Sequence, residues 1–174
     1  MTDRVASRTV GERVVLEPVT PDLARAIVAG DLSGLNPGQG WPHDDTLDAM
    51  GMATTADAAP GWLIVVADQV VGDCGTFGWP NEAGEVEIGY GLAAPFRGQG
   101  YGTEAVRAMC IWLFTEAAAR VIKADVLADN AASRALLGKL GFYVTGTRDD
   151  IVSYAFALRQ QGATAQEIGE ALRG

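Results

Sequence analysis

Cysteine and histidine are scarce in this chain, which has two cysteines, Cys74 and Cys110, and one histidine, His43. The cysteines are far apart and form no Cys-x-x-Cys repeat, which argues against a structural zinc site or a dithiol redox centre. We expect both to be small core residues, and their low number fits a reduced, cytoplasmic setting. The sequence therefore predicts no metal site.

Positive charge is also sparse. Lys and Arg total 13 against 22 Asp and Glu, which gives a formal net charge of −9. A nucleic-acid partner requires a basic face on the protein, so this class of function is not expected. An acidic cleft attracts cations instead, and the charge balance favours a small cationic partner.

Long apolar runs are absent as well. No uninterrupted run is long enough to span a bilayer, and the first ten residues lack the apolar stretch of a signal peptide. We therefore expect no membrane partner. The length of 174 residues predicts one domain over 1–174, with its core at about 12–158 and a C-terminal extension at 159–174.

Turn signals and apolar periodicity divide the chain into short strands and helices. Strands are predicted at 13–17, 62–67, 70–77, 85–91, 121–127, 143–146 and 151–158. Helices are predicted at 20–29, 45–52, 103–117, 133–140 and 164–172. Antiparallel strands come first, and one strand–helix–strand crossover follows them. This order predicts a mixed α/β sheet with a single parallel pair near its centre.

Gly89 and Gly91 lie inside the strand predicted at 85–91. Glycine weakens a strand, so this pair indicates a bulge or a backbone that a ligand approaches closely.

The segment from Arg97 to Thr103 (Arg-Gly-Gln-Gly-Tyr-Gly-Thr) is the most informative part of the sequence. Its three glycines remove side chains, so that main-chain N–H groups can close on a bound group. The following helix adds unpaired N–H donors and the positive end of its dipole. A phosphate or diphosphate is the natural occupant of such a turn, and Arg97 supplies a charged fork beside it.

Two other kinds of phosphate-binding turn fit this segment less well. Gly100-x-Gly102-x-x-Ala105, with Asp125 about 20 residues further on, fits a dinucleotide-binding turn. The preceding strand is not a buried apolar run, however, and too little chain follows to build a second mononucleotide half. A P-loop fits worse, because no Gly-Lys-Ser/Thr ends the turn.

Two motifs taken together resemble the GNAT superfamily of acyl-CoA-dependent N-acetyltransferases. The turn at 97–103 is similar to the diphosphate-binding turn of that family. The segment 130–142 (Asn-Ala-Ala-Ser-Arg-Ala-Leu-Leu-Gly-Lys-Leu-Gly-Phe) is similar to its Asn-x-x-Ser…Lys-x-Gly-Phe helix. Stretches at 12–16, 90–92 and 103–105 resemble the branch that contains the ribosomal-protein N-terminal acetyltransferases.

The resemblance implies a mostly antiparallel mixed sheet, splayed between two central strands and covered by helices on both faces. It also implies acetyl-CoA as the acyl donor, with its diphosphate on the glycine turn and its amide-bearing arm along a strand edge that ends at Pro95. The residues expected to bind the donor are Leu92, Ala93, Ala94, Arg97, Gly98, Gln99, Gly100, Tyr101, Gly102, Thr103 and Asn130.

The resemblance places a general base close to Glu87. An alkylammonium has a pKa of about 10.4 and attacks only when neutral, so a carboxylate must remove its proton. The plainer alternative for Glu87 is a solvated carboxylate on an exposed strand face. For the departing thiolate, Ser133 matches the position that donates a proton in the ribosomal-protein branch. Many relatives have a tyrosine where this chain has Leu137, and helix capping is the alternative role of Ser133.

The acceptor is expected to be a small cationic amine or a peptide N-terminus, attacking directly in a ternary complex. Trp41, His43 and Glu85 are the candidate acceptor-binding residues, although an incidental loop histidine also fits His43. A non-catalytic acyl-CoA-binding or sensing domain is the rival interpretation, because it accommodates Leu137. The sequence allows a monomer or a homodimer.

Overall fold

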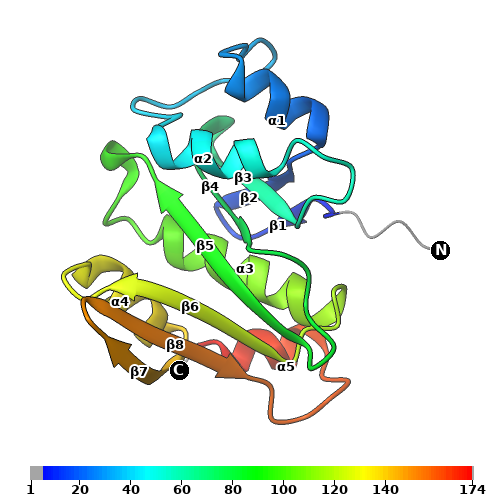
Figure 1. The fold of residues 1–174 in the computed structure, drawn as a ribbon, viewed down its shortest axis with the longest axis vertical. Helices are drawn as coiled ribbons and strands as arrows, with labels where there is room; N and C mark the ends of the chain where they lie inside the picture. The colour runs from blue at the N-terminus through cyan, green and yellow to red at the C-terminus, as the bar shows by residue number, and fades with distance from the viewer. Residues whose placement is uncertain (1–5, 174) are drawn as a thin grey trace.

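Eight strands form one sheet in the order β1-β2-β3-β4-β5-β6-β8-β7 (Figure 1). The computed structural model describes residues 6–173, so the ends of the predicted 1–174 domain lie outside the described residues. The strands are β1 (Thr9–Val10), β2 (Val14–Pro18), β3 (Gly61–Val66), β4 (Gln69–Thr76), β5 (Glu85–Leu92), β6 (Val121–Leu127), β7 (Tyr143–Arg148) and β8 (Ile151–Ala157). All neighbouring strands are antiparallel except β5 and β6, which are parallel. The predicted mixed, mostly antiparallel sheet is confirmed.

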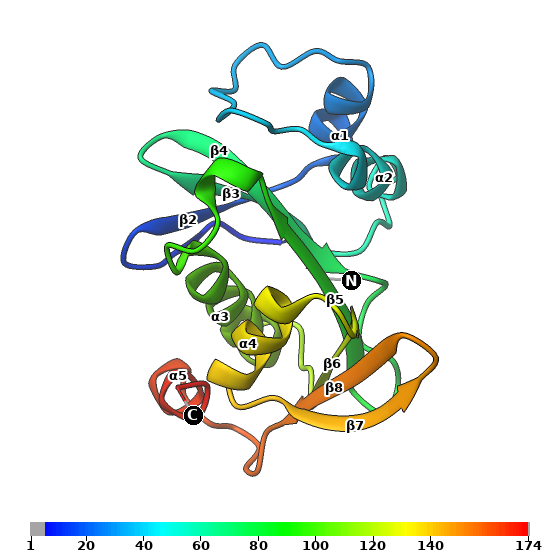
Figure 2. The ribbon, with the colours of Figure 1, turned by 90° about the vertical axis from the view of Figure 1, so that its left-hand side faces the viewer.

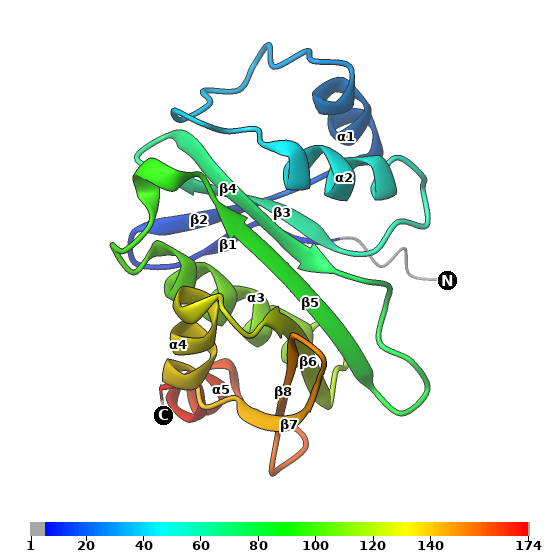
Figure 3. The ribbon, with the colours of Figure 1, turned by 60° about the vertical axis from the view of Figure 1, so that its left-hand side comes forward.

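Helices cover both faces of this sheet, as Figures 2 and 3 show. They are α1 (Pro21–Val28), α2 (Asp44–Met52), the short 3₁₀ helix η1 (Ala94–Phe96), α3 (Tyr101–Thr115), α4 (Ala131–Lys139) and α5 (Ala165–Ala171). The helices α1 and α2 pack on one face over a small apolar cluster that includes Ile27, Met50 and Leu63. A larger core lies under α3 on the other face and includes Met109 and Leu113.

Local signals explain several helix ends. The Thr20 side chain caps α1 by accepting the N–H of Leu23, with Pro21 in the first turn. Thr164 and Glu167 form a capping box at the start of α5. α5 packs on α3, where the Arg107 guanidinium donates to the Gly169 carbonyl at 2.7 Å. The C-terminal extension is therefore part of the packed domain.

Several element boundaries differ from the prediction by one or two residues, and two of these differences have a local cause. Helix α3 begins at Tyr101 instead of residue 103, because Gly100 already has a left-handed φ of 85° and ends the preceding turn. The hairpin between β3 and β4 turns at Ala67 and Asp68, both with positive φ, one residue earlier than expected.

The central parallel pair, β5 and β6, is joined only at its start. The register runs through Glu85/Val121, Val86/Ile122 and Glu87/Lys123 and then stops, although both strands continue. Figure 1 shows the two strands diverging beyond this point. The predicted bulge at Gly89–Gly91 is wrong, because the register of β4 with β5 is unbroken from Gly72/Leu92 to Thr76/Ile88. The splay comes from β6 leaving β5.

Candidate functional site

The gap between β5 and β6 exposes main-chain groups of β5. In the antiparallel pair with β4, Phe77 N–H donates to the Glu87 carbonyl and Ala93 N–H to the Val71 carbonyl. Hydrogen-bonded positions alternate along a strand, so the main chain of Tyr90 and the N–H of Leu92 face the gap instead. Amide groups of an extended ligand can pair with this edge as an absent strand would.

The sequence predicted that the free main-chain groups lie at residues 92–94, which is slightly too far along the chain. Ala93 is fully engaged, since its N–H donates to Val71 and its carbonyl accepts from Phe96 at 3.0 Å. The Ala94 carbonyl accepts the N–H of Arg97. The prediction of free main-chain groups is therefore wrong for Ala93, because η1 folds the chain back at this point. The Leu92 carbonyl is also used, by the Nε atom of Arg97 at 2.9 Å.

The glycine turn after η1 presents a row of free donors. Within residues 6–173, none of the N–H groups of residues 98–103 has a hydrogen-bond acceptor, and no side chain caps α3. Gly98 and Gly100 have φ of 74° and 85°, which L side chains rarely adopt. The turn and the first turn of α3 thus form a concave set of amide donors at the positive end of a 15-residue helix. This arrangement fits a diphosphate.

A contact from a distant strand holds this turn in place. The Glu104 carboxylate, in the first turn of α3, accepts the N–H of Val14 at 2.9 Å and pairs with the Arg13 guanidinium at 3.1 Å. Arg13 also donates to the Gln99 carbonyl at 3.0 Å. Partial burial alone raises the pKa of Glu104, but these hydrogen bonds and the Arg13 charge outweigh it, and the pKa is lowered. Arg13 thereby offsets the negative charge of Glu104 beside the candidate anion site.

The other side of the gap is formed by the start of α4. Asn130 caps this helix, its Oδ1 accepting the N–H of Ser133 at 3.1 Å. The Ser133 hydroxyl lies beside the Tyr90 phenol, yet no hydrogen bond joins them, and the Tyr90 hydroxyl is buried without a partner among the described residues. Burial raises the pKa of Tyr90, and Ser133 opposes that shift. Leu137 is fully buried in the core beneath them.

Glu87 stands at the point where β5 and β6 separate. Its pKa is raised, mainly by partial burial and then by the charge of Asp125, while Lys123 opposes the shift. Glu85 lies two residues earlier on β5, and its Oε2 atom forms an ion pair with Lys123 Nζ at 2.8 Å. Hydrogen bonding and charge from Lys123 lower the pKa of Glu85. The two carboxylates thus differ: Glu87 is the better proton acceptor, and Glu85 is held in an ion pair.

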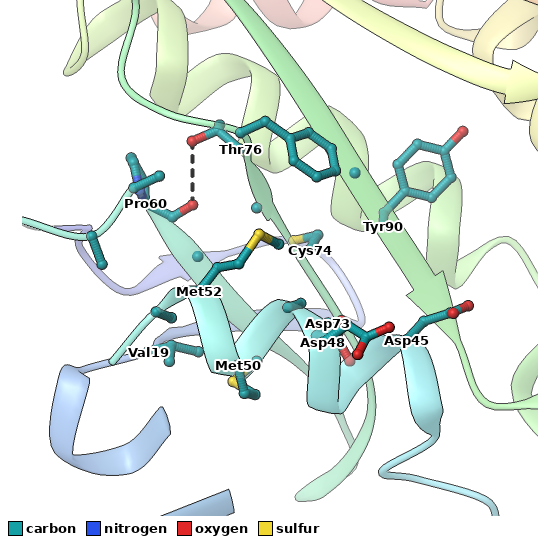
Figure 4. A pocket seen from close by; sticks show the side chains of 18 of the residues that line it. Val19, Asp45, Asp48, Met50, Met52, Pro60, Asp73, Cys74, Thr76 and Tyr90 are labelled. Atoms are coloured by element: carbon teal, nitrogen blue, oxygen red, sulfur yellow. Dashed lines mark hydrogen bonds between the residues drawn. The ribbon is translucent and has the colours of Figure 1, made fainter. Parts of the chain in front are cut away.

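A cavity of about 710 Å³ lies on the other face of β5, between α2 with its following loop and the strands β3 to β5 (Figure 4). Its walls are largely apolar and include Met50, Met52 and Phe77. Four aspartates also line it, namely Asp45, Asp48, Asp57 and Asp73, and no Lys or Arg is among the lining residues. The cavity is therefore a negatively charged, apolar-walled chamber beside the gap.

The two glycines of β5 make room for rings at the inner end of the cavity. A Cβ atom on Gly89 would lie 3.0 Å from the Phe77 ring, and one on Gly91 would lie 3.5 Å from the His43 ring. Both rings rest on the strand at these positions. Close packing against Phe77 favours glycine at position 89, whereas a Cβ at position 91 would make an ordinary van der Waals contact with His43.

Of the two residues predicted to bind the acceptor from this loop, His43 lines the cavity and Trp41 does not. His43 lines the cavity and caps α2, with its Nδ1 accepting the Thr46 N–H at 3.3 Å. Trp41 is buried and does not line the cavity, because its indole N–H donates to Asp73 Oδ2 at 3.0 Å. Glu85 also lies outside the lining.

Sequence reasoning missed three residues of this region, Asp73, Tyr90 and Arg13. Asp73 is a charged residue within an otherwise apolar strand, which is a signal that the sequence did offer. Tyr90 and Arg13 act through contacts with α4 and α3, and no local pattern reveals such contacts. Among residues 6–173 no cluster of three or more His, Cys, Asp or Glu side chains could hold a metal ion. No helix in that range is long and apolar enough to cross a membrane.

The chain was compared with known families and proteins. Residues 13–143 match the family model described as an acetyltransferase (GNAT) domain. An N-acetyltransferase of Bacillus subtilis strain 168, YjdG, is 32% identical over 111 residues, covering 59% of this chain and 66% of the relative. The N-acetyltransferase p20 of Bacillus licheniformis is 34% identical over 88 residues, covering 51% of this chain and 49% of the relative. The matches thus span about half to two thirds of the length of these relatives.

Solved structures share the fold. Mycobacterium smegmatis RimJ, in complex with CoA-disulfide, superposes with a TM-score of 0.64 at 22% identity, covering 97% of this chain and 94% of that one. Ribosomal-protein-S5-alanine acetyltransferase from Vibrio fischeri gives a TM-score of 0.66 at 15% identity, covering 91% and 100%. At these identities the likeness establishes the arrangement of strands and helices.

Proposed function

Because the chain belongs to the GNAT acetyltransferase family, we propose that it transfers the acetyl group of acetyl-CoA to a primary amine. The observation that carries the proposal is the row of unpaired N–H groups over residues 98–103, next to a strand edge that lacks its partner. Acetyl-CoA has a diphosphate that these N–H groups can bind and an arm with two amides that can pair with the strand edge. It supplies the acyl group when bound.

The donor is held by main-chain groups. The N–H groups of the glycine turn bind the diphosphate, with Arg97 beside them, and the edge at Tyr90 and Leu92 pairs with the arm. Asn130 closes the gap from α4, with its Oδ1 engaged in capping, which leaves its Nδ2 group as a donor for the ligand. The N–H of Tyr90 points into the gap and is suited to stabilise negative charge that develops on the thioester oxygen.

Glu87 removes the proton of the attacking amine. It lies where the gap opens, and its raised pKa brings it closer to the range in which a base is effective at neutral pH. Asp125 on the facing strand adds negative charge, which attracts the ammonium before it loses its proton.

Ser133 returns a proton to the departing thiolate. The buried Tyr90 hydroxyl lies beside Ser133 without a partner of its own among residues 6–173, so it is available as a positioning residue for the Ser133 hydroxyl. Neither cysteine is suited to carry the acetyl group. Burial raises the pKa of both Cys74 and Cys110, which keeps the thiols protonated at neutral pH. Direct attack in a ternary complex is therefore the proposed route.

The acceptor is a small cationic amine or a peptide N-terminus. The apolar, acidic cavity supports the first class. The similar structure from Vibrio fischeri is a ribosomal-protein-S5-alanine acetyltransferase, and this name supports a peptide N-terminus as the acceptor.

A non-catalytic acyl-CoA-binding domain is the second candidate, and Leu137 at the position of the usual tyrosine favours it. Thiol release from acetyl-CoA, measured with a panel of amines and peptides, separates the two. Turnover on at least one amine supports the transferase. Saturable CoA binding without turnover on any acceptor would favour the binding domain.

A further inference from the structure

We propose that the cavity on the α2 face binds an acceptor that carries a second positive charge, and that Asp73 pairs with that charge. This inference rests on the proposed acetyl transfer and names its acceptor class, an alkyl diamine or a similar dication. The inference concerns the cavity, which is separate from the gap proposed to bind the donor.

Asp73 is an unusual carboxylate for its surroundings. Asp73 lies on the central strand β4 and is only 7% exposed. One oxygen, Oδ2, accepts the Trp41 indole N–H at 3.0 Å and the Thr46 hydroxyl at 2.6 Å. Both of these hydrogen bonds go to Oδ2, whereas the other oxygen, Oδ1, accepts none from residues 6–173, and Asp73 is part of the cavity lining. The carboxylate is thus oriented by two donors with one oxygen left for a ligand.

No cation within the described chain compensates this charge. Asp73 takes part in none of the ion pairs found among residues 6–173, and the cavity lining contains no Lys or Arg. A buried carboxylate is costly unless it is paired with a positive charge. Asp45 and Asp48 from α2 line the same cavity (Figure 4) and add to its negative potential. A ligand ammonium supplies the charge that the protein lacks.

The position of Asp73 indicates that this charge is distinct from the reacting amine. Asp73 pairs with Gly91 on β4 and β5, while the gap lies along the far edge of β5. Strands are about 4.8 Å apart, so the carboxylate and the gap are separated by roughly 5–10 Å. The two nitrogens of an extended four-carbon diamine lie about 6 Å apart, from bond lengths of about 1.5 Å. The apolar walls suit the methylene chain between them.

Acceptor pairs that differ only in the second charge test this inference. We expect the wild-type kcat/KM for 1,4-diaminobutane to exceed that for butylamine by about tenfold or more. Asp73→Asn keeps an oxygen for Trp41 and Thr46 but removes the charge. It should lower kcat/KM for the diamine by roughly 10- to 100-fold and leave butylamine nearly unchanged. Asp68→Asn, in the β3–β4 turn outside the cavity lining, is the charge-matched control and should change neither.

Equal losses for both amines in Asp73→Asn would overturn the inference, because they would place Asp73 at the reacting amine. A wild-type preference for butylamine or for peptides would overturn it as well. Calorimetric binding of 1,4-diaminobutane to the CoA-bound protein provides a readout that needs no turnover. If no amine is acetylated but the diamine binds wild type and not Asp73→Asn, acetyl transfer fails and the inference stands. If the diamine binds neither protein, the inference fails.

Discussion

The suitability of Glu87 as a base comes from its surroundings. Glu85 and Glu87 are the same residue type on the same face of one strand, yet Lys123 forms an ion pair with Glu85 alone. Partial burial, followed by the Asp125 charge, raises the pKa of Glu87. A raised pKa makes the carboxylate a stronger base but leaves it ionised only above that pKa. Glu87 can therefore act as a base only above its raised pKa.

Replacing Glu87 with Gln should lower kcat/KM by roughly 10²- to 10⁴-fold near neutral pH. The wild-type rate should fall as pH decreases through the raised pKa of Glu87, and the variant should lose this dependence. The difference should shrink toward pH 10, because the amine with its pKa of about 10.4 is then partly neutral without help. Rates measured across pH test this, with Glu82→Gln in the exposed turn before β5 as control. An unchanged pH profile would remove Glu87 from the role of base.

A second prediction at the residue scale concerns Ser133 and Tyr90. Ser133→Ala should reduce kcat by about 10- to 100-fold with little change in CoA affinity, since it acts on the leaving thiolate. Tyr90→Phe should have a smaller effect in the same direction. If Tyr90 acts through Ser133, the double variant should be no slower than Ser133→Ala. Steady-state kinetics of the four proteins decide this, and additive losses would contradict the coupling.

At the scale of elements, contacts from the start of β2 hold the glycine turn and α3, which we propose as the donor site. Arg13 and Val14 reach the first turn of the helix through Glu104, which is 90 residues away from Val14 in the sequence. Arg13 also contacts the turn itself at Gln99. The anion site is thus fixed by a contact across the sheet, and flexibility in this turn would weaken donor binding.

Gly100→Ala tests the turn. Its φ of 85° is unfavourable for alanine by about 1–2 kcal/mol, and the added methyl would lie 3.0 Å from Arg13 Nη2. We expect the Kd for CoA to rise about tenfold or more, measured by calorimetry, while the protein stays folded. Gly51→Ala in α2 is the matched control, because nothing lies within 4 Å of its Cβ position. Equal CoA affinity in both variants would contradict the assigned role of the turn.

Most elements could be predicted from local patterns, and the reasons are visible in the structure. Thr20 with Pro21 and Thr164 with Glu167 are self-contained capping signals, so their helices start where the sequence places them. The splay could not be located in this way. It depends on where β6 leaves β5 after Glu87, and the sequence pointed to a bulge at Gly89–Gly91 instead. The Phe77 ring packed on Gly89 accounts for one of these two glycines.

The candidate site was predictable where a motif carries it and not where distant contacts do. The segments 97–103 and 130–142 indicated the donor site because main-chain groups follow from local sequence. The acceptor side depends on the bonds from Trp41 and Thr46 to Asp73, which join residues about 30 positions apart. His43 was expected as a pocket residue and does line the cavity, but its capping of α2 was not foreseen.

At the scale of the whole molecule, the sheet separates two sides that meet only at the gap. Helices α3 and α4 with the glycine turn lie toward one face, and α1, α2 and the acidic cavity lie on the other (Figure 2). A donor and an acceptor can therefore approach from different sides and be present together. This layout favours transfer in a ternary complex over a covalent enzyme intermediate, in agreement with the protonated, buried thiols.

The most direct test of this account is a crystal structure of the protein with CoA. We predict the diphosphate within hydrogen-bonding distance of the N–H groups of residues 98–103, and the arm paired with the main chain of Tyr90 and Leu92. The thiol should then lie between β5 and Ser133. A diphosphate bound elsewhere, or an arm that lies outside the gap, would contradict the account.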